Sequence, residues 1–133
     1  MPATGLADGI YKVYAVDASG NLSSASSNSV TVDTTMPAGT FLLKWGSNGS
    51  GDGQFYGPYG VAVDGSGNVY VADTNNHRVQ KFDSSGNFLL KWGSQYYGDG
   101  QFQYPQGVAV DSSGNVYVAD TNNHRIQKFS SGE

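Results

Sequence analysis

The chain has 133 residues and a formal net charge of −4 at pH 7, from 7 basic and 11 acidic side chains. It has no cysteine, which excludes disulfides and zinc sites with thiolate ligands. Because it has no block of basic residues and no apolar run near the roughly 20 residues of a membrane helix, we expect no nucleic-acid partner and no membrane partner. Its 19 glycines are typical of a turn-rich β protein.

The first segment, residues 1–35, has a pattern that predicts two strands. Apolar and polar residues alternate along 9–17 and along 29–33, and a serine-rich stretch connects them. This pair is similar to the last two strands of a bacterial immunoglobulin-like domain, with Tyr11 at the position of its corner tyrosine. The resemblance implies a truncated remnant and an extracellular or cell-surface location, although residues 1–4 lack the features of a signal peptide. Residues 36–40 are expected to form a linker.

The rest of the chain, residues 41–133, is dominated by an internal repeat. Phe41–Ser84 recurs as Phe88–Ser131 at an offset of 47 residues, and nine of the 44 aligned positions differ. Strand-like runs separated by turn clusters predict strands at 60–64, 68–73 and 78–82 in the first copy and at 88–92 where the second copy begins. Four short antiparallel strands per repeat predict an all-β fold made of β-propeller blades, two in this chain.

The size of the side chains indicates the order of the strands within a blade. The first strand carries Gly60 and Ala62, small residues that suit the crowded axis of a propeller. The fourth strand carries Leu89, Leu90 and Trp92, which suit the wide outer edge. We therefore expect residues 60–64 to be innermost.

Three motifs recur in both copies, and in the first copy they are PYGVAVD at 58–64, GNVYVAD at 67–73 and NNHRVQKF at 75–82. These motifs resemble the NHL repeat. The leucine of the family's name is replaced by arginine at positions 78 and 125. The resemblance implies a propeller, commonly of six blades, that binds proteins, RNA or small ligands, and a minority of the family are lyases. The second copy matches these motifs through Pro105, Asp111, Asp120 and 123–126.

The two histidines, His77 and His124, occupy the same position in the two copies. One interpretation is a set of imidazoles that binds a metal or acts as a base, since metal-bound histidines matter in the lyase members of the family. The interpretation we favour is structural, with each histidine bonded to Asp73 or Asp120 and fixing a turn. We expect no catalytic residue, no metal site and no cofactor.

Acidic residues in the loops are a second candidate for chemistry. Asp52 and Asp99 lie between glycines, and Asp64 and Asp111 begin turns, so their oxygens could bind calcium. They lack the dense alternation of ligands seen in an EF-hand loop. Turn chemistry therefore explains them better.

The differences between the copies indicate where a ligand would bind. Six of the nine fall in the connection from the outer strand of one blade to the inner strand of the next. Strand parity places this connection on the same face as the turn at 74–77. Tyrosine with adaptable amides is typical of binding surfaces, although loops also drift without function. The candidate ligand-binding residues are Tyr56, Tyr59, Tyr96, Tyr97, Gln103, Tyr104, Gln106, Asn76 and Asn123.

The sequence therefore favours a non-enzymatic scaffold that binds a protein or a glycan. The alternatives are a metal-dependent lyase or hydrolase that uses His77 and His124, and a purely architectural module that self-assembles. The expected strands start with an outer strand at 41–45 and stop after the third strand of the second blade. Because this offset lets one chain complete the blade of another, we expect a homotrimeric ring of six blades, with four and eight as other ring sizes.

Overall fold

The computed structural model describes residues 9–12, 29–32 and 35–132, which fall into two compact units, Met1–Leu42 and Leu43–Glu133. In the first unit, β1 (Gly9–Lys12) pairs antiparallel with β2 (Ser29–Val32). These strands confirm the two that the sequence predicts there. The remainder of the first predicted strand, residues 13–17, lies outside the described residues.

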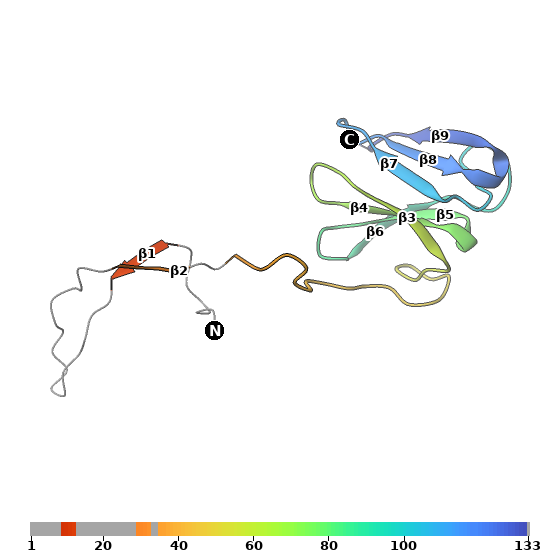
Figure 1. Ribbon diagram of the computed structural model, residues 1–133. Coiled ribbons are helices and arrows are strands. Elements are labelled where there is room, and N and C mark those ends of the chain that lie inside the picture. The colour runs from red at the N-terminus through yellow and green to blue at the C-terminus, as the bar shows by residue number, and fades with distance from the viewer. Residues whose placement is uncertain (1–8, 13–28, 33–34, 133) are drawn as a thin grey trace. The chain divides into compact units, whose positions relative to one another are not determined.

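The second unit contains two small antiparallel sheets, one of four strands and one of three (Figure 1). The described residues form only strands, loops and two short 3-10 helices, so the fold is all-β and consistent with propeller blades. No helix in this part of the chain is long and apolar enough to cross a membrane. In sheet order the strands are β3 (Pro58–Val63), β4 (Val69–Asp73), β5 (Arg78–Phe82) and β6 (Phe88–Trp92), then β7 (Gly107–Val110), β8 (Val116–Asp120) and β9 (Arg125–Phe129), with η1 (Thr74–Asn76) and η2 (Thr121–Asn123) between strands.

The turn between β3 and β4 shows why the strand boundaries fall where they do. The carboxylate of Asp64 accepts hydrogen bonds from the backbone N–H groups of Ser66 and Asn68, at 2.9 Å each. Gly67 takes a φ of +85°, which a residue without a Cβ adopts at little cost. Asp111 makes the same pair of bonds in the second repeat. These contacts confirm the turn chemistry expected for both aspartates.

The inner strands of the two sheets lie close together. A Cβ placed on Gly60 of β3 would come within 2.4 Å of the carbonyl oxygen of Gln106, just before β7. No larger residue fits there without a shift of the backbone, because real Cβ atoms do not approach an oxygen so closely. The contact shows that the strand containing Gly60 is crowded, which is consistent with the innermost position expected for it.

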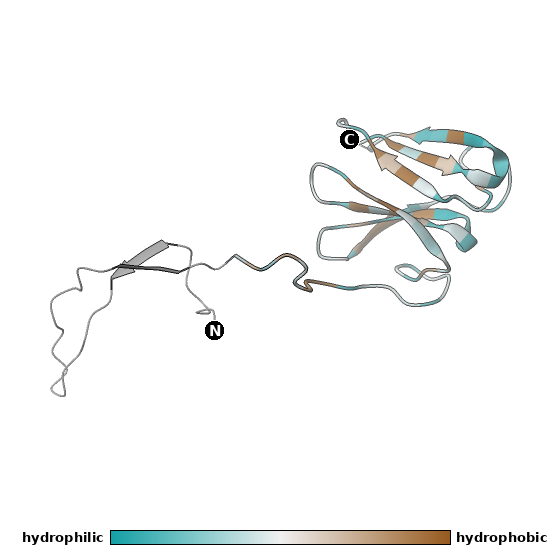
Figure 2. Cartoon of the chain, viewed as in Figure 1, coloured by the Kyte–Doolittle hydropathy of each residue, from teal (hydrophilic) through white to brown (hydrophobic). Residues whose placement is uncertain are grey.

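The hydrophobic core lies between the two repeats. Tyr70 and Val79 of the first sheet pack against Phe102, Val116 and Val118 of the second repeat, and all five side chains are buried. Hydrophobic residues lie along the strands and hydrophilic ones at the turns (Figure 2). Burial of this apolar surface holds the two sheets together.

One predicted strand is absent. Residues 41–45 have the same sequence as β6, Phe-Leu-Leu-Lys-Trp, but they form no strand, and Phe41 and Leu42 are each 72% exposed. The prediction of an outer strand here is wrong for the isolated chain because a strand needs an edge to pair with. In the described residues, β6 pairs with β5, whereas no strand lies alongside 41–45. Trp45 nevertheless packs on Phe82, with ring centroids 5.7 Å apart.

Candidate binding rim

Two loops form one rim of the repeat unit, and a buried carboxylate holds each of them. We define the rim loops as residues 46–59 and 93–106, so that the first one includes the first two residues of β3. Asp73, at the end of β4, is fully buried and accepts a hydrogen bond of 2.8 Å from the backbone N–H of Tyr56. It also accepts bonds from the side chains of Asn76 at 2.9 Å, Arg78 at 2.7 Å and Gln80 at 3.2 Å. The aspartate thereby joins the first rim loop to strand β5.

Arg78 and Gln80 extend this network into the loop. The Arg78 guanidinium donates to the carbonyl oxygens of Ser50, Gly51 and Gln54, at 2.8–2.9 Å. Gln80 is also fully buried, and its amide accepts from the N–H of Gly53 at 2.9 Å and donates to Gln54 at 2.6 Å. Since five loop groups are bonded to the sheet, the rim loop is fixed in position before any ligand arrives.

The second rim loop is held in the same way. Asp120 accepts from the backbone N–H of Gln103 and from the Arg125 guanidinium, each at 2.7 Å. Burial by itself would raise the pKa of Asp120. The hydrogen bonds from Gln103, Asn123, Arg125 and Gln127 outweigh burial, so this pKa lies below its ordinary value. The carboxylate therefore stays charged in the folded protein near neutral pH.

The side chains that differ between the repeats stand on this fixed frame. Tyr59, Tyr96 and Tyr97 are exposed, from 61% to 77%. A shallow cavity of about 440 Å³ opens between the two rim loops and is lined by Tyr59, Tyr104 and Gln106 together with Asn75 and Asn122. The loops and the turns that begin with Thr74 and Thr121 thus share one face, as strand parity predicts.

This arrangement of repeated hairpins, buried aspartates and pinned loops occurs twice, and comparison with known proteins identifies it. Residues 55–82 and 102–129 match the NHL repeat. The chain carries two NHL repeats. No curated protein matches the chain. The match does not extend to residues 1–54, so it lends no support to the immunoglobulin-like resemblance of residues 1–35.

The remaining predicted site residues occupy different places on the NHL repeats. Tyr56 lines a second cavity, of about 340 Å³, with Trp45 and Phe55. Asn76 and Asn123 do not reach the main cavity, since their amides donate to Gly49 or Tyr96 carbonyls and to the buried aspartates. The neighbouring Asn75 and Asn122 line that cavity instead. The sequence did not indicate Asn75 and Asn122, because each copy has two consecutive asparagines. Only the structure shows which asparagine of each pair lines the cavity.

His77 serves the junction between the NHL repeats. It is 8% exposed, takes a left-handed φ of +53° at the end of η1, and its Nδ1 accepts a hydrogen bond from the backbone N–H of Tyr104 at 3.1 Å. Its ring lies 4.4 Å from that of Tyr104. The expected bond from His77 to Asp73 is wrong, because Asp73 binds Asn76, Arg78 and Gln80 instead. Burial lowers the pKa of His77, which favours the neutral ring that can accept.

No group of three or more potential metal ligands lies together in the described residues. Nδ1 of His77 is already an acceptor, so it could bind a metal only by giving up Tyr104. The carboxylate oxygens of Asp64 and Asp111 are occupied by donors within their own turns. Asp52 pairs with Lys91 at 2.6 Å in an exposed position. The geometry of these side chains accordingly serves turns and junctions.

Proposed function

We propose that the chain is a non-enzymatic binding scaffold that recognises a protein or a glycan through the rim loops. The observation that carries this proposal is the cavity of about 440 Å³ between them, where Tyr59 and Tyr104 meet three amide side chains. Tyrosine rings provide apolar faces with a polar tip, and amides donate and accept hydrogen bonds. This combination suits a sugar face with its hydroxyls, or a peptide with its amides.

The frame beneath the rim supports the same proposal. Ordering a loop on binding costs free energy, and loops that are already fixed avoid much of that cost. The buried Asp73 and Asp120 networks are identical in residue type, whereas the exposed positions above them differ. A constant frame that carries variable tyrosines is an arrangement suited to recognition rather than to catalysis.

A glycan array followed by calorimetry with the best glycan tests the proposal, and a defined peptide library tests the protein alternative. We expect Tyr59→Ala and Tyr104→Ala to weaken binding at least about tenfold each, as removal of an aromatic anchor does. Ser66→Ala, in the exposed turn at the opposite end of β3 and β4, is the matched control and should bind as the wild type does. Equal affinity of all three variants for a confirmed ligand would place the binding site elsewhere.

A further inference from the structure

The two outward faces of the repeat unit are copies of the two surfaces that already pack together inside it. Val79 of the first repeat is completely buried against the second repeat, whereas its counterpart Ile126 is 66% exposed. On the other side, Val108 and Val110 are partly buried in the interface, whereas their counterparts Val61 and Val63 are 65% and 60% exposed. The chain therefore presents two exposed apolar surfaces. They are complementary because they are copies of the two surfaces that pack together between the repeats.

The hydrogen bonds across the internal junction can be repeated at these faces. Thr74 donates its hydroxyl to the carbonyl oxygen of Pro105 at 2.7 Å. Its counterpart Thr121 donates at 3.4 Å to Ala119 of its own sheet instead. Residue 58, the counterpart of Pro105, is also a proline, so its carbonyl could accept from Thr121 of another copy. Gly57 likewise has an N–H for His124, as Tyr104 has for His77.

The edge strand β9 lacks a neighbour that its counterpart β5 has. Phe82 of β5 contacts three rings, Trp45, Phe55 and Phe88, with centroids 5.6–6.1 Å away. Among the described residues, the ring of Phe129 of β9 pairs with two other rings only, those of Trp92 and Phe102, both at 5.6 Å. No fourth strand pairs with β9 in this part of the chain.

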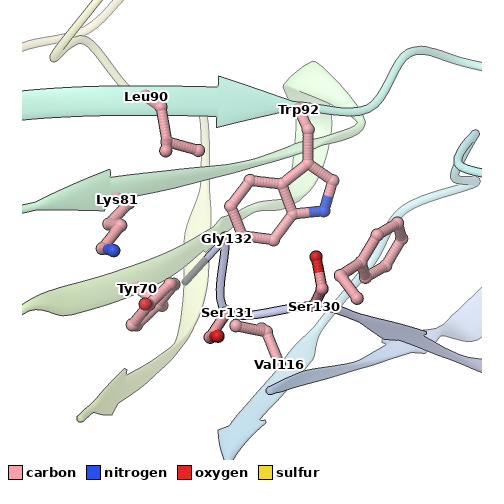
Figure 3. Close-up of a pocket in the computed structure, with 9 residues that line it drawn as sticks. Tyr70, Lys81, Leu90, Trp92, Val116, Ser130, Ser131 and Gly132 are labelled. Atoms are coloured by element: carbon pink, nitrogen blue, oxygen red, sulfur yellow. The ribbon is translucent and has the colours of Figure 1, made fainter. Parts of the chain in front are cut away.

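A cavity lies beside this incomplete cluster. It has a volume of about 260 Å³ and is lined mainly by apolar groups, including Leu90, Trp92, Val116 and Phe129. Figure 3 shows the Trp92 ring and Leu90 on one side of it and Val116 on the other. An aromatic side chain that packs on Phe129 as Phe88 packs on Phe82 would adjoin this space.

We propose that the occupant is residues 41–45 of a second copy of the chain, paired antiparallel with β9 as its fourth strand. The segment is identical in sequence to β6, its apolar side chains are exposed, and it is unpaired. The register of β5 and β6 then places Trp45 opposite Ile126, Leu43 opposite Lys128 and Phe41 opposite Phe129. The exposed valines of the second copy cover Ile126 at the same time.

Contacts of this head-to-tail kind form a closed ring when the rotation per copy divides a full turn. With two blades per chain, three copies give six blades, the number that the resemblance to the NHL repeat implies. The inference goes beyond the proposed function, because it concerns the faces between blades and not the rim. Loss of assembly and loss of ligand binding are separate results.

Disulfide trapping tests the register directly, because the chain has no cysteine of its own. Partner residues in antiparallel strands have Cα atoms about 4.5–5.5 Å apart, within the range that a disulfide spans. We expect the double variant Leu43→Cys with Lys128→Cys to oxidise into covalently linked chains on a denaturing gel, up to the mass of three. The matched pair Lys81→Cys with Leu90→Cys, which are neighbours within one chain, should oxidise without any increase in mass. Failure of the first pair to link chains while the second oxidises would overturn the proposal.

Light scattering, which measures the mass of the assembly, gives an independent test when the wild type is compared with a variant that lacks the apolar contact at Ile126. The wild type should have the mass of three chains, and a wild type that is a monomer would overturn the proposal. Ile126→Asp should dissociate the assembly, because a charge would be buried without a partner, and the 66% exposure of Ile126 leaves folding of the single chain intact. Tyr97→Ala on the rim is the control and should keep the wild-type mass. An Ile126→Asp variant that remains a trimer would also overturn the proposal.

Discussion

At the residue scale, the position after each 3-10 helix shows how one side chain can serve two repeats. His77 sits in the left-handed region, closes η1, and accepts a hydrogen bond from a residue 27 positions further along the chain. His124 has the same left-handed conformation, with a φ of +55°, but it is exposed. Identical local sequences therefore give the same backbone, and the neighbouring repeat decides what the side chain contacts.

The junction at His77 predicts a pH dependence of stability. Burial lowers the pKa of His77 in the folded state, so as the pH falls the unfolded chain takes up this proton first. The neutral His77 side chain contributes to the free energy of unfolding at pH values above the ordinary histidine pKa of about 6.5. This contribution is lost as the pH falls from that value towards the lowered pKa of the folded state. The melting temperature of the wild type should fall as the pH is lowered from about 7.5 to about 5.5. The melting temperature of the His77→Asn variant should fall less over the same range, and asparagine tolerates the left-handed φ at this position. An equal fall in both proteins would exclude His77 as the cause.

At the element scale, the loops depend on strands that are distant in sequence. The sequence predicts the hairpins well: β5 and β6 have the predicted bounds, and β4 begins one residue later than expected. These elements follow from local signals, namely the alternation of apolar residues and turns begun by aspartate. Strand pairing at a sheet edge is not local, and for this reason the same five residues form β6 at 88–92 and no strand at 41–45.

The buried network was harder to predict than the strands. In the sequence, Arg78 stands only as a replacement for the leucine of the family motif. In the structure it bonds to Asp73 and to three loop carbonyls. A signal was present, because Arg78 and Gln80 are two residues apart and so lie on the same face of a strand. The partners 24–28 residues away could not be known before the loop was placed.

Replacing this arginine tests how far the network stabilises the loop. Arg78→Leu leaves the Asp73 carboxylate buried without its cation and removes one hydrogen-bond donor from each of three loop carbonyls. We expect it to lower the free energy of unfolding by about 3–5 kcal/mol, measured by urea denaturation at a fixed protein concentration. Lys91→Ala is the matched control, because the side chains of Lys91 and Asp52 are 46% and 54% exposed, and it should cost about 1 kcal/mol or less. Comparable losses in the two variants would show that burial of the Asp73 pair has little effect.

At the scale of the whole molecule, the chain consists of two compact units that meet between Leu42 and Leu43. The sequence predicts the boundary between the two parts slightly earlier, with a linker at 36–40 and the repeats from residue 41. The difference has a physical cause, since residues 41 and 42 belong to the repeat by sequence but have no strand beside them.

Division into units predicts that the repeats fold without the first segment. Deletion of residues 1–38 should leave a cooperative unfolding transition at nearly the wild-type temperature, because the described core lies entirely within residues 70–129. A deletion of residues 1–45 serves as the comparison and should lower the transition, since it removes Trp45 from Phe82. Differential scanning calorimetry measures both. Loss of the transition in the shorter deletion would mean that residues 1–38 take part in folding.

The sequence repeat and the four-stranded sheet begin at different points of the chain. This difference affects how further repeats could be added to such a protein. By sequence, each 47-residue repeat begins with the segment Phe-Leu-Leu-Lys-Trp and continues with the three strands of one sheet, and among the described residues only the copy at 88–92 is paired as a fourth strand. Insertion of one further unit at any point in the repeat therefore adds four strands and re-creates the same junction on both sides. Unequal recombination in the gene can change the number of blades without the need for a new interface. The near-identity of the two repeats is what would make such junctions interchangeable.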